Sequence, residues 1–222
     1  MKILSIKNII AFAAIVTVTI SACRKDDYFV DGGLSHQSPE DMKMSVYDFL
    51  KSRENHMFDS LVKVIDLTGT KDLVNQPNIT FFAAPNQAVL RLQQNFVPDD
   101  RQTPRPLSDI GLDTLKNLLG RFIITDVQLT LEQAVLDKKK YYKAYNGDSL
   151  YIHGSDGGVK PGTTLQTSAY YITYEHRKIP GVDSVNYNGT FQTHNLVTAN
   201  AIVHVLKYKS SFAAGLKQKY YR

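Results

Sequence analysis

The chain has a single cysteine, Cys23, and this residue directly follows a short apolar run. Lys2 and Lys7 precede twelve uncharged, largely apolar residues, and the small pair Ser21-Ala22 comes just before the cysteine. A positive start, a short apolar centre and a small-residue cleavage site are typical of a secretory signal. A helix that spans a bilayer needs about 20 apolar residues, so this run fits a removed signal better than a permanent anchor. We therefore expect residues 1–22 to be cleaved and the remaining chain to fold outside the cytoplasm.

The segment Ile20-Ser21-Ala22-Cys23 resembles the lipobox of bacterial lipoproteins, in which the cysteine thiol takes up a diacylglyceryl group. The alternative is a chance cysteine after an ordinary signal peptide. Lipidation accounts for a lone thiol in an exported protein, and two or more acyl chains anchor a protein stably. The next residues, Arg24-Lys25-Asp26-Asp27, look like the tag that sends Bacteroidetes-type lipoproteins to the cell surface; a solvated linker is the alternative. These resemblances imply an outer-membrane protein that is lipid-anchored and surface-exposed.

The charge of the mature chain gives no sign of nucleic-acid binding. Without Lys2 and Lys7, the 26 basic residues become 24, against 21 acidic residues, which is a net charge of +3. Proteins that bind nucleic acid usually concentrate basic residues on one face, so we expect no such partner. The densest basic run, Lys138 to Lys140 with Lys143, is predicted to be a solvated loop.

The mature chain is long enough for one domain. Residues 23–38 mix charge, glycine and serine, and we predict an acylated cysteine followed by a flexible tether. Residues 39–208 form the predicted domain, with a length typical of a single core. The tail, residues 209–222, either packs on the domain or contacts a partner or an anionic membrane surface.

Apolar spacing changes from helix-like to strand-like along the domain. Steps of three and four residues predict one bent or two short helices between Val46 and Ile65, ending near Gly69, and further helices after Asn86, over 112–119 and over 129–136. Strands are predicted over 79–84 and 122–124. After Lys140, tyrosine-rich runs and turn signals predict most of the sheet, finishing with strands at 196–197 and 202–206. This order indicates an α+β domain.

Two of these segments resemble a known family. The run from Thr80 to Val89, TFFAAPNQAV, resembles the first signature of fasciclin domains. The run from Asn200 to Leu206, NAIVHVL, resembles the closing signature, in which an asparagine and a small residue lead into an apolar strand with a central histidine. Residues 115–124 and 129–131 are similar to the family's intervening helix, strand and short helix. The resemblance covers residues 45–208.

The resemblance implies a fasciclin-like β-wedge of two small sheets flanked by several helices, as found in extracellular adhesion and matrix proteins. Three departures limit it. Ala84 stands where the family usually has proline, and Ala201 where it usually has glycine. Arg121-Phe122 replaces a tyrosine-histidine pair whose surroundings contact integrins in animal members. Integrin binding therefore does not follow from the resemblance, and it implies no catalytic residue.

Signatures of catalysis are missing from the sequence. It contains no Gly-x-Ser-x-Gly elbow, His-Glu-x-x-His pair or phosphate-cradling glycine loop. His194 and His204 flank the last turn and can approach each other, but a zinc site needs a third ligand. We predict that the protein is not an enzyme and has no metal or cofactor. His204 is expected to be structural, with a ring nitrogen bonded to the backbone.

Tyrosine is the most suggestive residue type, with 13 in the chain. Its apolar ring and hydroxyl suit contacts with proteins and with sugar rings. Tyr151, Tyr170 and Tyr174 are the candidate binding residues, and ordinary strand packing is the alternative.

The sequence therefore leaves three functional hypotheses. The preferred one is a surface lipoprotein, held to the membrane through lipid on Cys23, whose fasciclin-like domain binds a protein or glycan outside the cell in adhesion or envelope assembly. The second is a glycan-binding accessory of an outer-membrane polysaccharide uptake system. The third is an unrecognised hydrolase. The oligomeric state stays open.

Overall fold

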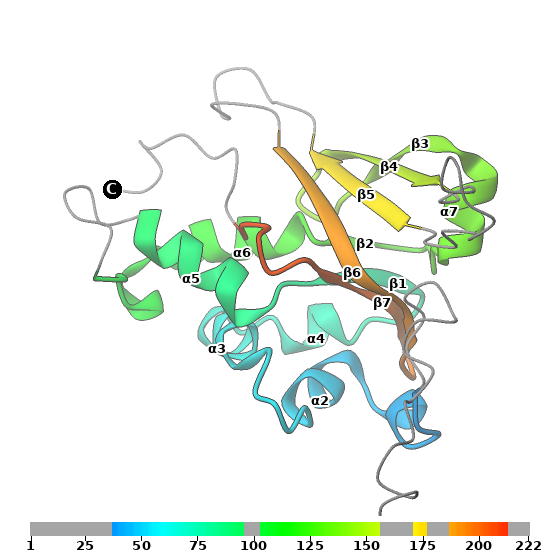
Figure 1. Cartoon of the computed structure of the whole chain (residues 1–222). Coiled ribbons are helices and arrows are strands. Elements are labelled where there is room, and N and C mark those ends of the chain that lie inside the picture. Colours follow the sequence, from blue (N-terminus) through cyan, green and yellow to red (C-terminus); the bar gives the residue numbers. More distant parts are fainter. Residues whose placement is uncertain (1–36, 96–102, 156–170, 177–186, 213–222) are drawn as a thin grey trace, which may run out of the picture.

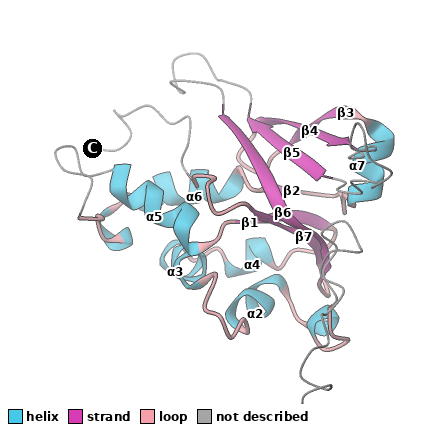
Figure 2. Cartoon of the chain, in the orientation of Figure 1, coloured by secondary structure: helices cyan, strands magenta, loops and turns pink. Residues whose placement is uncertain are grey.

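A computed structural model of the chain describes residues 37–95, 103–155, 171–176 and 187–212 (Figure 1). The elements separate into two groups, with most helices beneath and beside the lower strands and a smaller set of strands with one helix above them (Figure 2). Cys23 and Tyr170 lie outside the described residues, as does the predicted signal. No helix among the described residues has the length and apolar character needed to cross a bilayer.

The predicted helices are confirmed, with caps that follow from the sequence. Ser45 begins α2 and its side chain accepts a hydrogen bond from the amide of Asp48. Gly69 ends α3 in the left-handed conformation at φ 63°, which glycine adopts without strain. The described helices are α2 (Val46–Lys51), α3 (Asp59–Thr68), α4 (Lys71–Val74), α5 (Asn86–Asn95), α6 (Leu112–Gly120) and α7 (Leu131–Asp137), with short 3₁₀ turns η1 (Asp41–Lys43) and η2 (Leu107–Asp109).

Asn86 is a cap for a neighbouring helix. Its side-chain oxygen accepts a hydrogen bond from the amide of Ser60, 2.8 Å away in the first turn of α3. Its side-chain nitrogen donates to the carbonyl of His56. The first signature thus ties the start of α5 to the start of α3.

The strands pair in one continuous order, β2-β1-β7-β6-β5-β4-β3. β1 and β7 are parallel, and every other pair is antiparallel. The described strands are β1 (Ile79–Ala83), β2 (Ile123–Ile124), β3 (Lys139–Lys143), β4 (Ser149–Ser155), β5 (Tyr171–His176), β6 (Tyr187–Val197) and β7 (Ala201–Leu206).

Strand β6 joins two small sheets. Its first residues, to Thr190, pair with β5, whereas those from Phe191 to Val197 pair with β7. Two register shifts interrupt the pairing with β7, and such bulges bend a strand and increase its twist. Figure 1 shows β6 running from the upper strands down to β7. The predicted α+β class, with two small sheets flanked by helices, is confirmed.

The central parallel pair forms the middle of the core. Every residue of β1 and β7 is buried, as expected for strands covered on both faces. Phe49, Leu61 and Leu118 from the helices belong to the same continuous cluster as Phe81 and Val203 from the strands.

Two sequence expectations need correction. The basic run is not a loop, because Lys139, Lys140 and Lys143 lie in β3, where all three lysines are exposed. An edge strand can carry lysines because one of its faces meets water, and they also discourage pairing with another chain. β6 is also much longer than the predicted strand at 196–197, since its polar first half lacks an apolar pattern.

Candidate functional site

Alternate residues of β3 and β4 form an exposed aromatic and basic surface. The two strands pair in regular register, with Tyr141 opposite Tyr151. Successive side chains on a strand point to opposite faces, so every second residue shares the face of this pair. We name this set the tyrosine surface, and it consists of Lys139, Tyr141, Lys143, Ser149, Tyr151 and His153.

The opposite face of the hairpin packs on helix α7. Leu150 and Ile152 are buried there. A Cβ atom on Gly154 would lie 2.5 Å from the backbone nitrogen of Val135 and 2.6 Å from the carbonyl carbon of Ala134, so the strand contacts the helix backbone directly. The hydroxyl of Tyr142 donates to Asp137 at the end of the helix, at 2.9 Å. The tyrosine surface therefore has a packed support behind it.

The rings of the tyrosine surface lie against one another. The centroids of Tyr141 and Tyr151 are 4.7 Å apart with 34° between their planes, and those of Tyr151 and His153 are 6.0 Å apart. Tyr141 is 58% exposed although it contacts its neighbour. Mutual contact restricts the rotamers of the two tyrosines, so less conformational entropy remains to be lost when a ligand binds.

The predicted binding tyrosines are not all placed together. Tyr151 lies on the tyrosine surface. Tyr174 lies in β5 at the register position of buried Ile152, whereas Glu175 is the register partner of Tyr151. The sequence did not single out His153, although its two-residue spacing from Tyr151 on a strand is the signal that could have identified it.

Asn200, the first residue of the second signature, joins three segments of backbone. Its side-chain oxygen accepts from the amide of Val46 at 2.9 Å. Its side-chain nitrogen donates to the carbonyls of Val74 at 3.1 Å and Gln76 at 2.9 Å. This asparagine therefore holds α2 and α4 to the start of β7, which is a structural role.

The two signatures also hold a common loop. The hydroxyl of Thr80 donates to the carbonyl of Val127 and accepts from the amide of Leu129, at 2.7 and 2.8 Å. From the other signature, Nε2 of His204 bonds the carbonyl of Leu129 at 2.8 Å. The backbone bond predicted for His204 is confirmed.

His194 and His204 form a buried pair, with 3.3 Å between their Nδ1 atoms. Because the Leu129 carbonyl only accepts, Nε2 of His204 carries its proton, and Nδ1 of the neutral ring accepts from Nδ1–H of His194. Burial, and to a smaller extent the neighbouring His204 and Lys207, lower the pKa of His194 to about 3. Burial lowers the pKa of His204 to about 4, against a smaller opposite effect of its bond to Leu129. Both rings are thus neutral at physiological pH.

A buried ion pair occupies the place where the family resemblance breaks down. Nε of Arg121 lies 2.8 Å from a carboxylate oxygen of Asp148, and the side chains are only 4% and 6% exposed. Phe122 stacks on Phe212, with 5.0 Å between ring centroids. Phe212 is buried and its amide donates to the carbonyl of Ala88, so the start of the predicted tail packs on the domain. These residues support the fold and do not offer a contact surface.

The described residues contain no candidate metal site. No group of three or more histidine, cysteine, aspartate or glutamate side chains among them could hold an ion. The paired histidines are enclosed by Phe82 and Phe191, whose ring centroids lie 5.7 to 6.0 Å from those of the histidines they face.

No family model and no curated protein sequence matches the chain. Among solved structures, 14 chains match. One is described as a FAS1 domain pair from the insect cell adhesion molecule fasciclin I, with a TM-score of 0.49 and 19% identity. The match covers 74% of this chain and 47% of that one, so this protein spans about half the length of the structure to which it is similar.

Proposed function

We propose that this protein is a lipid-anchored, surface-exposed protein of the outer membrane whose fasciclin-like domain binds a protein or glycan outside the cell. It acts without catalysis, in adhesion or in assembly of the envelope. The lipobox-like segment before Cys23 supports the anchor. The two signature segments, which pair as β1 and β7, support the family assignment.

The single observation that carries the binding role is the pair formed by Tyr141, which is exposed, and Tyr151, which is half-buried. Their rings are in contact, one is mostly in water, and α7 supports the strands behind them. Tyrosine is enriched among the residues that dominate binding energy, because it offers a large apolar area and a hydroxyl.

Binding to an array of polysaccharides and extracellular matrix proteins tests this role. The mature chain should give a saturable signal that falls at least about tenfold in Tyr141→Ala and in Tyr151→Ala. Tyr208→Ala is the matched control, since Tyr208 is 55% exposed and lies outside the tyrosine surface. Equal losses in all three variants, or no loss in the first two, would contradict the assignment.

A glycan is the second candidate ligand, and the lysines of the tyrosine surface favour it. Lys139 and Lys143 lie on either side of Tyr141 along β3, and both are exposed. A tyrosine ring can pack against the face of a sugar while the lysines attract acidic groups on it. Binding that is confined to acidic polysaccharides and weakens with salt would select this candidate, whereas binding confined to proteins would select adhesion.

The anchor is tested in cells. The protein should partition into the membrane fraction, and Cys23→Ser should release it from that fraction. Protease added to intact cells should remove the wild-type protein. Survival in intact cells with loss after lysis would place the protein on the inner side of the membrane and contradict surface exposure.

A further inference from the structure

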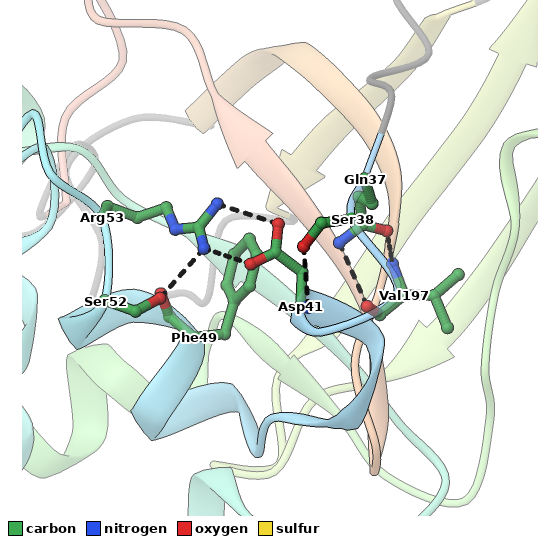
Figure 3. Close-up of polar contacts among 7 residues, drawn as sticks. All are labelled: Gln37, Ser38, Asp41, Phe49, Ser52, Arg53 and Val197. Atoms are coloured by element: carbon green, nitrogen blue, oxygen red, sulfur yellow. Dashed lines mark hydrogen bonds and ion pairs between the residues drawn. The ribbon is translucent and has the colours of Figure 1, made fainter.

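The first described residues cross the end of strand β6 as a strap, which we define as Gln37–Lys43. The side-chain amide of Gln37 bonds the backbone of Val197 in both directions. Its nitrogen donates to the Val197 carbonyl at 3.1 Å, and its oxygen accepts from the Val197 amide (Figure 3). The glutamine side chain thus pairs with β6 as the peptide group of an added strand would.

A second contact closes the strap on α2. The carboxylate of Asp41 accepts two hydrogen bonds from the guanidinium of Arg53, which is a bidentate ion pair. Arg53 is held in place by the Ser52 hydroxyl at 2.9 Å and by the ring of Phe49, whose centroid lies 4.3 Å from the guanidinium carbon. The Ser38 hydroxyl accepts from the amide of Asp41 at 3.1 Å and shapes the turn that presents the carboxylate.

The strap differs from the chain that follows it because none of the residues of its turn η1 is buried. Burial begins at Val46, which is fully enclosed. A pocket of about 170 Å³ is lined by Gln37 and Asp41 of the strap together with Phe58 and Val205 of the core. The hydrogen bonds and the ion pair that hold the strap are polar contacts.

We propose that the strap is a force-release element, which opens under tension on the tether before the domain unfolds. This inference rests on the proposed anchor at Cys23, because that anchor makes the N-terminal side the point where tension enters. Tension reaches the Gln37–Val197 bonds first and the Asp41–Arg53 pair next. Segments with few buried apolar contacts open at much lower free energy than the core.

Opening lengthens the tether while the fold stays intact. The strap has seven residues, and a fully extended chain spans about 3.4 Å per residue, so release adds up to about 24 Å. A domain that has bound its ligand could then move farther from the membrane while the tyrosine surface stays folded. None of the bonds broken on release, Gln37–Val197 and Asp41–Arg53, involves a residue of β3 or β4.

Single-molecule force spectroscopy on the chain from Cys23 to Arg222 tests the proposal. Protein made without lipid can be attached through the Cys23 thiol, because the chain has no other cysteine, and pulled from a C-terminal tag. The wild-type trace should show an extension of up to about 24 Å before the main unfolding event. The double variant Gln37→Ala with Asp41→Asn should lose this early extension and keep the main unfolding force.

Glu40→Gln is the matched control, since it removes an acidic charge from the same strap and Glu40 makes no capping bond. It should retain the early extension. Absence of the early step in the wild type overturns the proposal, as does a double variant whose main unfolding force falls with it, because the strap would then be part of the cooperative fold. The measurement involves no ligand or membrane, so it can succeed where the array or the cell assay fails.

Discussion

The parallel pair β1–β7 and the hairpin β3–β4 are both made of strand-forming residues, but the first is buried on both faces and the second on one. Each polar side chain that the signatures place on or beside β1–β7 is bonded to backbone, as Thr80, Asn200 and His204 show. On the hairpin, Tyr141 and the lysines face water. The comparison teaches that the recognisable motifs maintain the fold, whereas the candidate site lies where no motif was recognised.

The two regions are joined by the buried Arg121–Asp148 pair, from the end of α6 to the turn between β3 and β4. Asp148→Ala should give the largest effect, a loss of about 3 to 5 kcal/mol, because it leaves an uncompensated buried charge. Urea denaturation measures the change. If the regions fold independently, the variant should instead show two transitions.

The double variant Arg121→Leu with Asp148→Ala is the control for that mechanism. Removing both charges should restore a large part of the lost stability, since the penalty arises from the unpaired charge. A double variant no more stable than Asp148→Ala would indicate that packing at this site matters more than charge.

Gly154→Ala tests whether the tyrosine surface depends on its support. The new methyl group would meet the backbone of α7 at 2.5 to 2.8 Å, which side-chain motion cannot relieve. We expect a loss of about 3 kcal/mol, the upper end for an added methyl group in a packed site, together with weaker ligand binding. Gly111→Ala should cost less than about 1 kcal/mol, because the nearest atom would be a threonine oxygen 3.7 Å away. Full binding by Gly154→Ala would show that the surface tolerates movement of α7.

Asn200→Ala tests the structural reading of the signatures. It removes three side-chain hydrogen bonds and should cost about 2 to 3 kcal/mol without changing ligand binding. Asn75→Ala is the matched control: Asn75 accepts a hydrogen bond from the amide of Tyr47, so about 1 kcal/mol is expected. Thermal unfolding of both variants measures the two stability losses, and the loss in Asn200→Ala should be the larger. A loss of binding in Asn200→Ala alone would instead indicate that a ligand binds near the second signature.

The sequence predicted the buried region well because its signals are local. Spacing of apolar residues, the cap at Ser45 and the glycine after α3 determine helix ends through neighbouring residues. The outward surface of the hairpin follows from the pairing of Tyr141 with Tyr151, ten residues apart, which depends on a register that no single segment encodes. The length of β6 was missed for the same reason, since its polar first half is specified by pairing with β5.

The buried histidine pair gives the smallest effect for a single residue, and the effect depends on pH. Both histidines have folded pKa values below the ordinary 6.5, so the unfolded chain binds more protons below pH 6.5. The contribution of the two neutral histidines to the free energy of unfolding is therefore fully present above about pH 7. It falls as the pH drops through 6.5, by about 2 kcal/mol for each histidine between pH 7 and pH 5.

The variant His194→Gln should reduce this loss of stability by about 2 kcal/mol, as urea denaturation at both pH values would show. His56→Gln is the surface control, because the side chain of His56 is 78% exposed. The same loss in all three proteins would mean that a proton enters the pair without cost, which is incompatible with the enclosure by Phe82 and Phe191 on which the buried region depends.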